Sequence, residues 1–403
     1  MSLVRLPDDV VITGNSKIFL LVLDGVGGIQ HPRFKKTELQ AARKPNLDAL
    51  ASESVCGVLD AVMPGITPGS GPSHMALFGY DPLEHNIGRG ILSALGVDFH
   101  LTGRDLAARA NFATVDEKGN VVDRRAGRIS SEVNGRLCEK LARSVKLPHD
   151  VKLFIQTESE HRAVVVFRGE GLTGDVSDTD PQRLGVPALE PAALSPEASR
   201  SSEIVRSFLK QASEILESEH PANAILLRGF ATKKPFKSFR DRFKIEAAAV
   251  AKYPMYRGLA RLIGMEVLPA CDDMDAEIGL VEREFQKFDF FYIHVKKTDS
   301  YGEDGNFEDK VKTIELVDSK IPSLLALSPD VVVVTADHST PSAMKAHSWH
   351  PVPVLLWAKT CRVDDVVHFD EISCAKGGIG RMRMVHLMSL ILAHAGRLTK
   401  YGA

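Results

Sequence analysis

Four apolar runs along the chain indicate strands that are buried on both faces. The runs are Lys17–Leu23, Phe290–Val295, Val331–Val334 and Val352–Trp357. Strands without polar alternation are typical of parallel sheets, whose two faces are both covered by helices. Helical patterns separate the runs, for example over residues 46–53 and 307–327. Because strands and helices alternate, the sequence predicts an α/β fold with a mostly parallel sheet.

The middle of the chain has a different pattern of residues. Between about residues 101 and 190 the predicted strands are shorter, charged residues are frequent, and Gly or Asp turns recur. The segment 187–202 is rich in Pro, Ala and Ser, which is typical of an exposed connection. We therefore predict a smaller domain at 106–225, inserted between two segments of the core, 1–105 and 226–403.

Length and charge limit the classes of function. The 403 residues are enough for a large core, and 44% hydrophobic with 25% charged residues is ordinary for a globular enzyme. The formal net charge of -2 gives no reason to expect nucleic acid or an acidic membrane as a partner. A negatively charged substrate would need local positive charge, and nothing in the composition indicates an oligomeric state.

The cysteines and the apolar runs favour the cytoplasm. The chain has five cysteines without Cys-x-x-Cys spacing, which suits unpaired thiols in a reducing compartment rather than disulfides or a cysteine-based zinc site. Residues 1–10 lack the apolar core of a signal peptide, and no apolar run approaches the roughly 18 residues of a membrane span. We therefore expect a cytoplasmic protein.

Acidic residues and histidines lie at the ends of the predicted strands. They are Asp24 after the first run, Asp299 and Glu303 after the second, Asp337 and His338 after the third, and His347 before the fourth. Ligands of open α/β sheets bind beyond the carboxyl ends of the strands, so we expect these side chains at one edge. Mixed Asp, Glu and His donors suit one or two divalent ions such as Mn²⁺, with Mg²⁺, Co²⁺ or Zn²⁺ as alternatives.

Each of these residues also has a structural explanation. An Asp after a strand is most often a turn or a helix cap, and a lone histidine is most often a hydrogen-bonded structural residue. The adjacent pair Asp337-His338 after a valine run is harder to explain in this way. Its combination with Asp24, Asp299 and His347 favours the metal site.

A candidate nucleophile lies in a segment rich in glycine and proline, residues 63–82. Ser70 sits between glycines, where the backbone can turn sharply and approach a phosphate closely. The following residues, Ser73–Phe78, are predicted to begin a helix whose first N–H groups could help to bind an anion. A serine hydroxyl is a poor nucleophile unless a base or a metal activates it, and the predicted metal site could do so. Without that site, a surface loop would be the better interpretation.

Basic residues in or beside the middle region are candidates for binding phosphate or carboxylate groups, since an arginine fork contacts two oxygens at once. The residues of this region are Arg109, Asp123, Arg124, Arg125, Arg128, Arg228 and Arg257. Each arginine alone is more simply explained as a solvated surface charge. The runs 123–128 (DRRAGR) and 227–236 (LRGFATKKPF) favour binding more strongly.

Taken together, these motifs resemble those of the archaeal-type cofactor-independent phosphoglycerate mutases, a branch of the alkaline phosphatase superfamily. VTADH and PGS…H…FGYDP are the specific motifs. The resemblance continues along nearly the whole chain through VLDGVGG, ARKPNLDALA, DRRAGRIS, LRGFATKKPF, YRGLARLIGM, HVKKTDSYGEDG and HSWHPVPVLLW. It implies an alkaline-phosphatase-like α/β core with a mostly parallel sheet and helices on both faces, plus a smaller inserted α+β domain.

The resemblance also implies the roles of individual residues. Asp24, Ser70, Asp337 and His338 would surround one metal ion, with Ser70 as the nucleophile that forms a phosphoserine. Asp299 and His347 would bind a second ion, Mn²⁺ is the expected metal, and no 2,3-bisphosphoglycerate would be required. The residues that would hold the substrate are Arg109, Asp123, Arg124, Arg228 and Arg257.

The chain departs from the family pattern at two points. Gly71-Pro72 stands where archaeal relatives carry Asp-Thr after the nucleophile, so Ser73 is the alternative to Ser70. Glu303 stands where relatives carry a histidine. Because a carboxylate can ligate a metal, we expect Glu303 to belong to the second metal site.

By this resemblance, the chain would be an isomerase of glycolysis and gluconeogenesis that interconverts 3-phosphoglycerate and 2-phosphoglycerate. The Ser70 alkoxide would take the phosphoryl group, and the enclosed glycerate would reorient and take it back on its 2-hydroxyl. Water must be excluded, because it would turn the transferase into a phosphatase. Two alternatives stay open: a metal-dependent phosphatase or phosphodiesterase on the same core, and a non-catalytic protein that binds phosphate esters.

Overall fold

The computed structural model describes residues 6–85, 87–233 and 237–402. The end of the basic run 227–236 therefore lies outside the described residues. Among the described residues, no helix combines the length and the hydropathy that a membrane-spanning segment requires.

The chain divides into two compact units. Residues 1–86 and 236–403 form the first unit, and residues 87–235 form the second. The predicted inserted domain, 106–225, lies within the second unit, which is longer at both ends. One reason for the earlier start is that α4 (Arg89–Gly96) packs against strands of the second unit's sheet.

The first unit is built around an eight-stranded sheet with the order β13-β2-β12-β11-β1-β10-β8-β9. The strands are β1 (Ile18–Leu23), β2 (Val55–Asp60), β8 (Ala247–Val250), β9 (Glu266–Val267), β10 (Phe290–Val295), β11 (Val331–Thr335), β12 (Val352–Ala358) and β13 (Gly380–Arg383). The four predicted runs are thus β1, β10, β11 and β12. Every residue of β1 and β11 is buried, as expected for strands covered on both faces.

The sheet is mostly parallel, which confirms the predicted fold class. β1 runs parallel to β10 and β11, so that Leu21 lies beside Ile293 and Val334. β12 is antiparallel to both of its neighbours, β11 and β2. The loop that precedes β12 therefore lies at the same edge of the sheet as the carboxyl ends of β1, β10 and β11.

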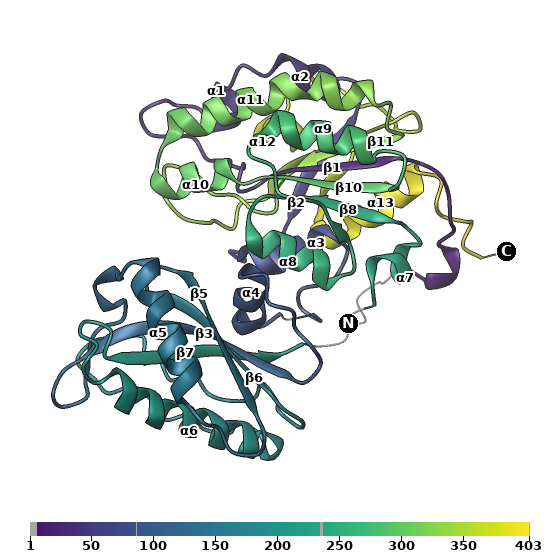
Figure 1. The fold of residues 1–403 in the computed structure, drawn as a ribbon. Helices are drawn as coiled ribbons and strands as arrows, with labels where there is room; N and C mark the ends of the chain where they lie inside the picture. The colour runs from purple at the N-terminus through teal and green to yellow at the C-terminus, as the bar shows by residue number, and fades with distance from the viewer. Residues whose placement is uncertain (1–5, 86, 234–236, 403) are drawn as a thin grey trace. The chain divides into compact units, whose positions relative to one another are not determined.

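Helices cover both faces of this sheet. They are α1 (Glu38–Ala41), α2 (Pro45–Ala51), α3 (Ser70–Leu77), α7 (Phe239–Phe243), α8 (Pro254–Leu262), α9 (Met274–Glu284), α10 (Lys297–Asp304), α11 (Phe307–Ala326), α12 (Glu371–Cys374) and α13 (Leu387–His394). Figure 1 shows α1, α2, α9 and α11 on one side, and α3, α8 and α13 on the other. α11 illustrates the reason, because Ile314, Val317, Ile321 and Leu324 form one buried stripe at helical spacing.

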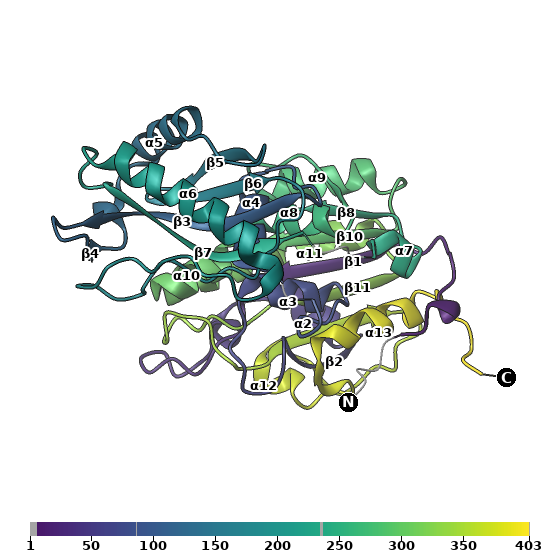
Figure 2. The same cartoon turned by 90° about the horizontal axis from the view of Figure 1, so that it is seen from below.

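The second unit has an antiparallel sheet with the order β4-β3-β6-β5, in which β7 also pairs with β3. Its strands are β3 (Asp105–Val115), β4 (Val121–Asp123), β5 (Lys152–Ser159), β6 (Arg162–Arg168) and β7 (Ala224–Thr232), and its longer helices are α5 (Ser131–Ser144) and α6 (Ser199–Leu216). Figure 2 shows α5 and α6 together over this sheet. Apolar side chains such as Phe112, Phe167 and Phe208 fill the space between them.

Candidate metal and nucleophile site

The carboxyl edge of the eight-stranded sheet gathers the predicted metal-binding side chains. Asp24 directly follows β1, Asp337 and His338 follow β11, Asp299 and Glu303 lie on α10 after β10, and His347 lies in the loop before β12. Asp24 and Asp337 are 0% exposed, and Asp299 and His338 are 1% exposed. Four polar side chains buried so completely at one edge need a compensating partner.

These side chains form two donor groups that share His338. One group is Asp24, Asp337 and His338, the other is Asp299, His338 and His347, and within each group the ligand atoms lie within 4.8 Å of one another. His338 Nε2 lies 3.1 Å from Asp337 Oδ2 and 3.5 Å from Asp24 Oδ1. The rings of His338 and His347 are stacked with their centroids 3.7 Å apart. Such mixed oxygen and nitrogen donors are suited to divalent metal ions.

The environment of Asp24 fits a bound cation. Both of its carboxylate oxygens are buried, and His294 and Lys296, which lie close to Oδ2, are not aligned for a full hydrogen bond within the described part of the chain. Burial and the neighbouring Asp337 act to raise the pKa of Asp24, but His294 and Lys296 outweigh them and lower it. The Lys296 ammonium lies 3.1 Å from Asp24 Oδ2 and also pairs with Asp299. One lysine thus faces several buried carboxylates, which leaves the site negatively charged.

The hydrogen bonds of His347 leave one of its ring nitrogens available to a metal. Its Nδ1 lies 3.0 Å from the carbonyl oxygen of Pro68. A carbonyl oxygen only accepts, so Nδ1 carries the proton and Nε2 carries the lone pair. Nε2 lies 3.6 Å from Asp299 Oδ1. His347 therefore presents the form of imidazole that binds metals.

Ser70 is the first residue of α3, three residues earlier than the predicted start of this helix. Its Oγ lies 3.4 Å from His338 Nε2 and so faces both donor groups. Ser73 is buried, and its Oγ lies 3.0 Å from the carbonyl oxygen of Gly69, 3.1 Å from that of Ser70 and 3.4 Å from Asp337 Oδ2. Because the Ser73 hydroxyl has carbonyl acceptors within its own helix, Ser70 stays the candidate nucleophile.

Glu303 lies at the margin of the site. Its Oε1 is 3.8 Å from His347 Nε2, and its side chain is 55% exposed. Partial burial and the nearby Asp299 raise the pKa of Glu303 above its ordinary value. Its carboxylate is outside the two donor groups, and its role as a ligand stays a prediction.

Sequence reasoning missed polar residues that surround the donor groups. His74 Nδ1 lies 2.9 Å from the carbonyl oxygen of Ser70 and 3.2 Å from Asp337 Oδ2. His294 Nε2 lies 3.2 Å from Asp24 Oδ2. The available signals were the spacing of His74, one helical turn after Ser70, and the position of His294 inside an apolar strand.

Three of the predicted substrate-binding residues form a basic cluster in the second unit. Arg109 on β3 lies opposite Arg228 on β7. Arg124 makes a two-point contact with Asp180, at 2.8 and 2.7 Å, and Arg228 Nη1 lies 3.8 Å from the same carboxylate. Burial and the neighbouring Arg109 lower the pKa of Arg228. An anion bound beside these guanidinium groups would reduce their mutual repulsion.

The other two candidates have structural partners. Asp123 accepts backbone N–H groups of Arg125 and Gly127 at 2.8 and 2.7 Å, which stabilises a turn. Arg257 belongs to α8 of the first unit and donates to the carbonyl oxygens of Ala251 and Leu268 at 3.1 and 2.8 Å. The substrate roles of all five residues stay predictions.

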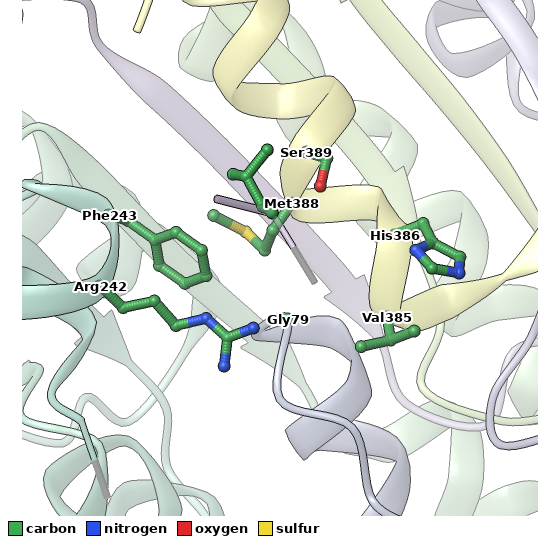
Figure 3. A pocket seen from close by; sticks show the side chains of 8 residues that line it. Gly79, Arg242, Phe243, Val385, His386, Met388 and Ser389 are labelled. Carbon is green, nitrogen blue, oxygen red and sulfur yellow. The ribbon is translucent and has the colours of Figure 1, made fainter. Parts of the chain in front are cut away.

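A separate small pocket of the first unit contains none of the predicted site residues. It is lined by Leu6, Gly79, Arg242, Phe243, Val385, His386, Met388 and Ser389. Figure 3 shows Phe243 and Met388 pointing toward each other across it. Because its lining holds no member of either donor group, the pocket is distinct from the candidate site.

Comparisons with known proteins give one consistent result. A family model described as 2,3-bisphosphoglycerate-independent phosphoglycerate mutase matches residues 51–223. A probable 2,3-bisphosphoglycerate-independent phosphoglycerate mutase of Thermus thermophilus is 50% identical over 391 residues, which is 96% of each chain. A probable enzyme of the same description from Thermosipho africanus is 50% identical over 396 residues, 98% of each chain.

Solved structures agree with the sequence relatives. The cofactor-independent phosphoglycerate mutase of Thermoplasma acidophilum has a TM-score of 0.76 and 30% identity, covering 94% of this chain and 100% of its own. A protein of Pyrococcus horikoshii has a TM-score of 0.81 and 29% identity, covering 96% of this chain and 100% of its own. These similarities extend over both units of the chain.

Proposed function

Because the chain belongs to the family of 2,3-bisphosphoglycerate-independent phosphoglycerate mutases, we propose that it isomerises phosphoglycerate through a phosphoserine on Ser70. Membership of this family makes the chain an isomerase that acts on phosphoglycerate without bisphosphoglycerate. The proposal extends to the nucleophile, the metal ligands and the substrate-binding residues. One observation carries it, namely that Ser70 Oγ at the start of α3 lies 3.4 Å from His338 Nε2.

The donor groups would hold two divalent ions. Asp24, Asp337 and His338 would hold one beside Ser70, and Asp299, His347 and Glu303 would hold the other. Carboxylate and imidazole donors without thiolates can bind Mn²⁺, which is our proposal among the candidate ions. Bound there, such ions would lower the pKa of the Ser70 hydroxyl and stabilise charge on the phosphoryl oxygens.

The residues of the chain itself account for the positioning of the reactants. Ser70 Oγ attacks the phosphorus of 3-phosphoglycerate while the bond to the 3-hydroxyl oxygen breaks. The 2-hydroxyl of the same glycerate then attacks the phosphoserine and releases Ser70. N–H groups in the first turn of α3 and the Lys296 ammonium supply positive charge to the phosphoryl oxygens.

The glycerate must be held between these two steps. Arg109, Arg124 and Arg228 carry guanidinium groups that suit its carboxylate, and Asp180 orients two of them. If water reached the phosphoserine first, the products would be glycerate and phosphate.

An enolase-coupled assay with 3-phosphoglycerate tests the proposed function, with phosphate release measured in parallel. We expect chelation to abolish isomerisation, Mn²⁺ to restore it, and phosphate release to stay a small fraction of turnover. Phosphate release as the main reaction would favour the phosphatase alternative. Tight binding of 3-phosphoglycerate without turnover in any of the four metals would favour a binding protein.

The proposed setting is glycolysis and gluconeogenesis in the cytoplasm. All five cysteines are unpaired, and Cys56, Cys138 and Cys374 are buried. Free thiols are usual in a reducing compartment. Fractionation of cells that express the tagged chain would test this placement.

A further inference from the structure

We propose that Thr340 is a positioning residue that joins the two donor groups and holds His338 in the tautomer with Nε2 free for a metal. Thr340 lies in the loop after β11, two residues beyond His338, and is 0% exposed. The inference rests on the proposed metal site and adds a residue that contacts neither metal nor substrate. Its action is exerted through the hydrogen bonds of one hydroxyl group.

The hydroxyl of Thr340 lies between one ligand from each side of the site. Its Oγ1 is 2.6 Å from Asp299 Oδ1 and 3.0 Å from His338 Nδ1. A hydroxyl has a single proton to donate, and a carboxylate oxygen only accepts. The Thr340 proton therefore goes to Asp299, and His338 Nδ1 must donate its own proton to the Thr340 oxygen. The result is a directed chain of two hydrogen bonds from His338 to Asp299.

This chain fixes which nitrogen of His338 is free. With the proton on Nδ1, the lone pair is on Nε2, which faces Asp24 and Asp337 at 3.5 and 3.1 Å. The opposite tautomer would place a proton at the metal position and leave Nδ1 and the Thr340 oxygen without a proton between them. The hydroxyl thus favours the metal-binding form before any metal arrives.

The backbone of Thr340 extends the link to the loop that carries Asp24. Its N–H donates to the carbonyl oxygens of Gly25 and Gly27, each at 3.1 Å. Its carbonyl oxygen accepts from Lys310 Nζ at 2.8 Å, and Lys310 also donates to Gly25 O at 3.0 Å. One residue therefore connects the segments that follow β1, β10 and β11.

Gly25 leaves the space that the Thr340 hydroxyl occupies. A Cβ atom at position 25 would lie 2.5 Å from Thr340 Oγ1 and 2.7 Å from Asp299 Oδ1, and the φ of Gly25 is +61°. Both the left-handed backbone and the close approach require glycine here. Glycine at position 25, directly after the proposed ligand Asp24, thus leaves room for the Thr340 hydroxyl.

The test compares Thr340→Val, which removes the hydroxyl at nearly constant volume, with Thr340→Ser, which keeps it. Thr335→Val is the matched control, because Thr335 is also 0% exposed but its hydroxyl donates to the Pro353 carbonyl at 2.9 Å. The first readout is the Mn²⁺ dissociation constant from calorimetry on each protein. The second is the protonated nitrogen of His338, located by ¹⁵N NMR in the metal-free protein.

We expect Thr340→Val to weaken Mn²⁺ binding roughly 10- to 100-fold and Thr340→Ser to restore most of it. Thr335→Val should bind Mn²⁺ like the unaltered protein. His338 should carry its proton on Nδ1 in every variant that keeps the Thr340 hydroxyl. A proton on Nε2 in the unaltered protein would overturn the inference, as would normal Mn²⁺ binding by Thr340→Val or equal losses in both valine variants. Failure of the unaltered protein to bind Mn²⁺ would instead overturn the proposed function, and this inference with it.

Discussion

Two serines in the first turn of α3 have different hydrogen-bond partners, and this difference makes their proposed roles testable. Ser70 Oγ faces His338 Nε2, whereas Ser73 Oγ is engaged by the carbonyl oxygens of Gly69 and Ser70. We expect Ser70→Ala to lose on the order of 10⁴-fold or more in turnover, because the covalent intermediate cannot form. Ser73→Ala should lose no more than about 100-fold, because it only supports the helix start and Asp337.

The enolase-coupled assay on both variants separates the two serines, and calorimetry shows whether each still binds Mn²⁺. A dead Ser73→Ala protein beside an active Ser70→Ala protein would reverse the assignment. Phosphoserine detected on Ser70 in a quenched reaction would provide direct chemical support.

Glu303 allows a test of how the second donor group is completed. Its carboxylate is 3.8 Å from His347 Nε2 and could turn toward an ion held by Asp299 and His347. We expect Glu303→Ala to lose activity that excess Mn²⁺ restores only in part, since one coordination position is gone. Glu303→His should stay active and shift its preference toward Zn²⁺ or Co²⁺, because imidazole is a softer donor than carboxylate.

Activity measured across Mn²⁺, Mg²⁺, Co²⁺ and Zn²⁺ decides this point. The neighbouring Asp304 serves as a control, since it is an exposed acid at the end of the same helix. If both Glu303 variants match Asp304→Ala in rate and metal ranking, Glu303 is a solvated acid at the end of α10.

At the residue scale, the sequence predicted which polar side chains meet at the edge of the sheet but not which neighbours contact them. Asp24, Asp337 and His338 were recognisable because polar residues directly follow apolar strands. Thr340 follows no strand directly, and His74 was marked only by its spacing one helical turn after Ser70. Their roles follow only from distances across the fold, such as the 2.6 Å between Thr340 and Asp299.

Secondary-structure elements outside the donor groups also support the site. α11 contributes a buried lysine, Lys310, that does so. Lys310 is 0% exposed, donates to the carbonyl oxygens of Gly25 and Thr340, and lies 3.7 Å from Glu38 Oε1. Lys310→Met would remove a hydrogen-bond donor from the carbonyl oxygens of Gly25 and Thr340 and the cation beside the buried Glu38 carboxylate. We expect it to lower the unfolding midpoint and to weaken Mn²⁺ binding roughly 10-fold or more.

Arg397→Met is a matched control for the loss of a buried cation. Arg397 is also 0% exposed, but it binds Ser16 and the Lys244 carbonyl oxygen, near the amino end of β1. It should lower the unfolding midpoint while leaving Mn²⁺ affinity unchanged. Equal Mn²⁺ affinity in both variants would show that Lys310 serves stability alone.

On α9, a buried acid makes stability depend on pH. Burial raises the pKa of Glu277 from its ordinary 4.5 to about 7, against the opposing effect of Lys252. The folded chain therefore keeps this proton between pH 4.5 and 7 while the unfolded chain releases it, so this contribution to stability falls as pH rises through that window. One pKa unit corresponds to about 1.4 kcal/mol, so the effect amounts to a few kcal/mol at most.

Glu277→Gln removes the titrating group and keeps its shape. Between pH 5 and pH 8, Glu277→Gln should lose less stability than the unaltered protein. Urea unfolding at both pH values measures this difference. A Glu277→Gln protein whose stability difference between pH 5 and pH 8 equals that of the unaltered protein would contradict a buried, titrating Glu277.

The sequence predicted His347 at the edge where the other donors lie, and the arrangement of elements explains how it reaches that edge. The sequence predicted β12 from Val352 onward, but an apolar run does not reveal the direction of its strand. Since β12 is antiparallel to β11, the loop before it reaches the edge where β1 and β11 end, and His347 joins Asp299 there. The register in which β12 pairs with its neighbours could not be predicted from the sequence either, because pairing depends on the whole sheet rather than on one segment.

For the whole molecule, the proposed mechanism requires that glycerate is retained during the lifetime of the phosphoserine. The basic cluster of Arg109, Arg124 and Arg228 in the second unit is our proposal for this task. We expect Arg228→Met to raise KM for 3-phosphoglycerate and to increase the ratio of phosphate released to 2-phosphoglycerate formed. The physical reason is that glycerate held by fewer charged contacts dissociates sooner, and water then takes the phosphoryl group.

Arg136→Met is the matched control in the same unit. Arg136 pairs with Glu219 at 2.7 Å on an exposed surface, and its side chain is 58% exposed. Its removal should change neither KM nor the product ratio, because exposed ion pairs contribute little beyond their own contact. Coupled enolase and phosphate assays on the same samples give both quantities, with Ser70→Ala as the background. An unchanged product ratio in Arg228→Met would assign glycerate retention to other residues, whereas a rise in both variants would indicate a general loosening of the second unit.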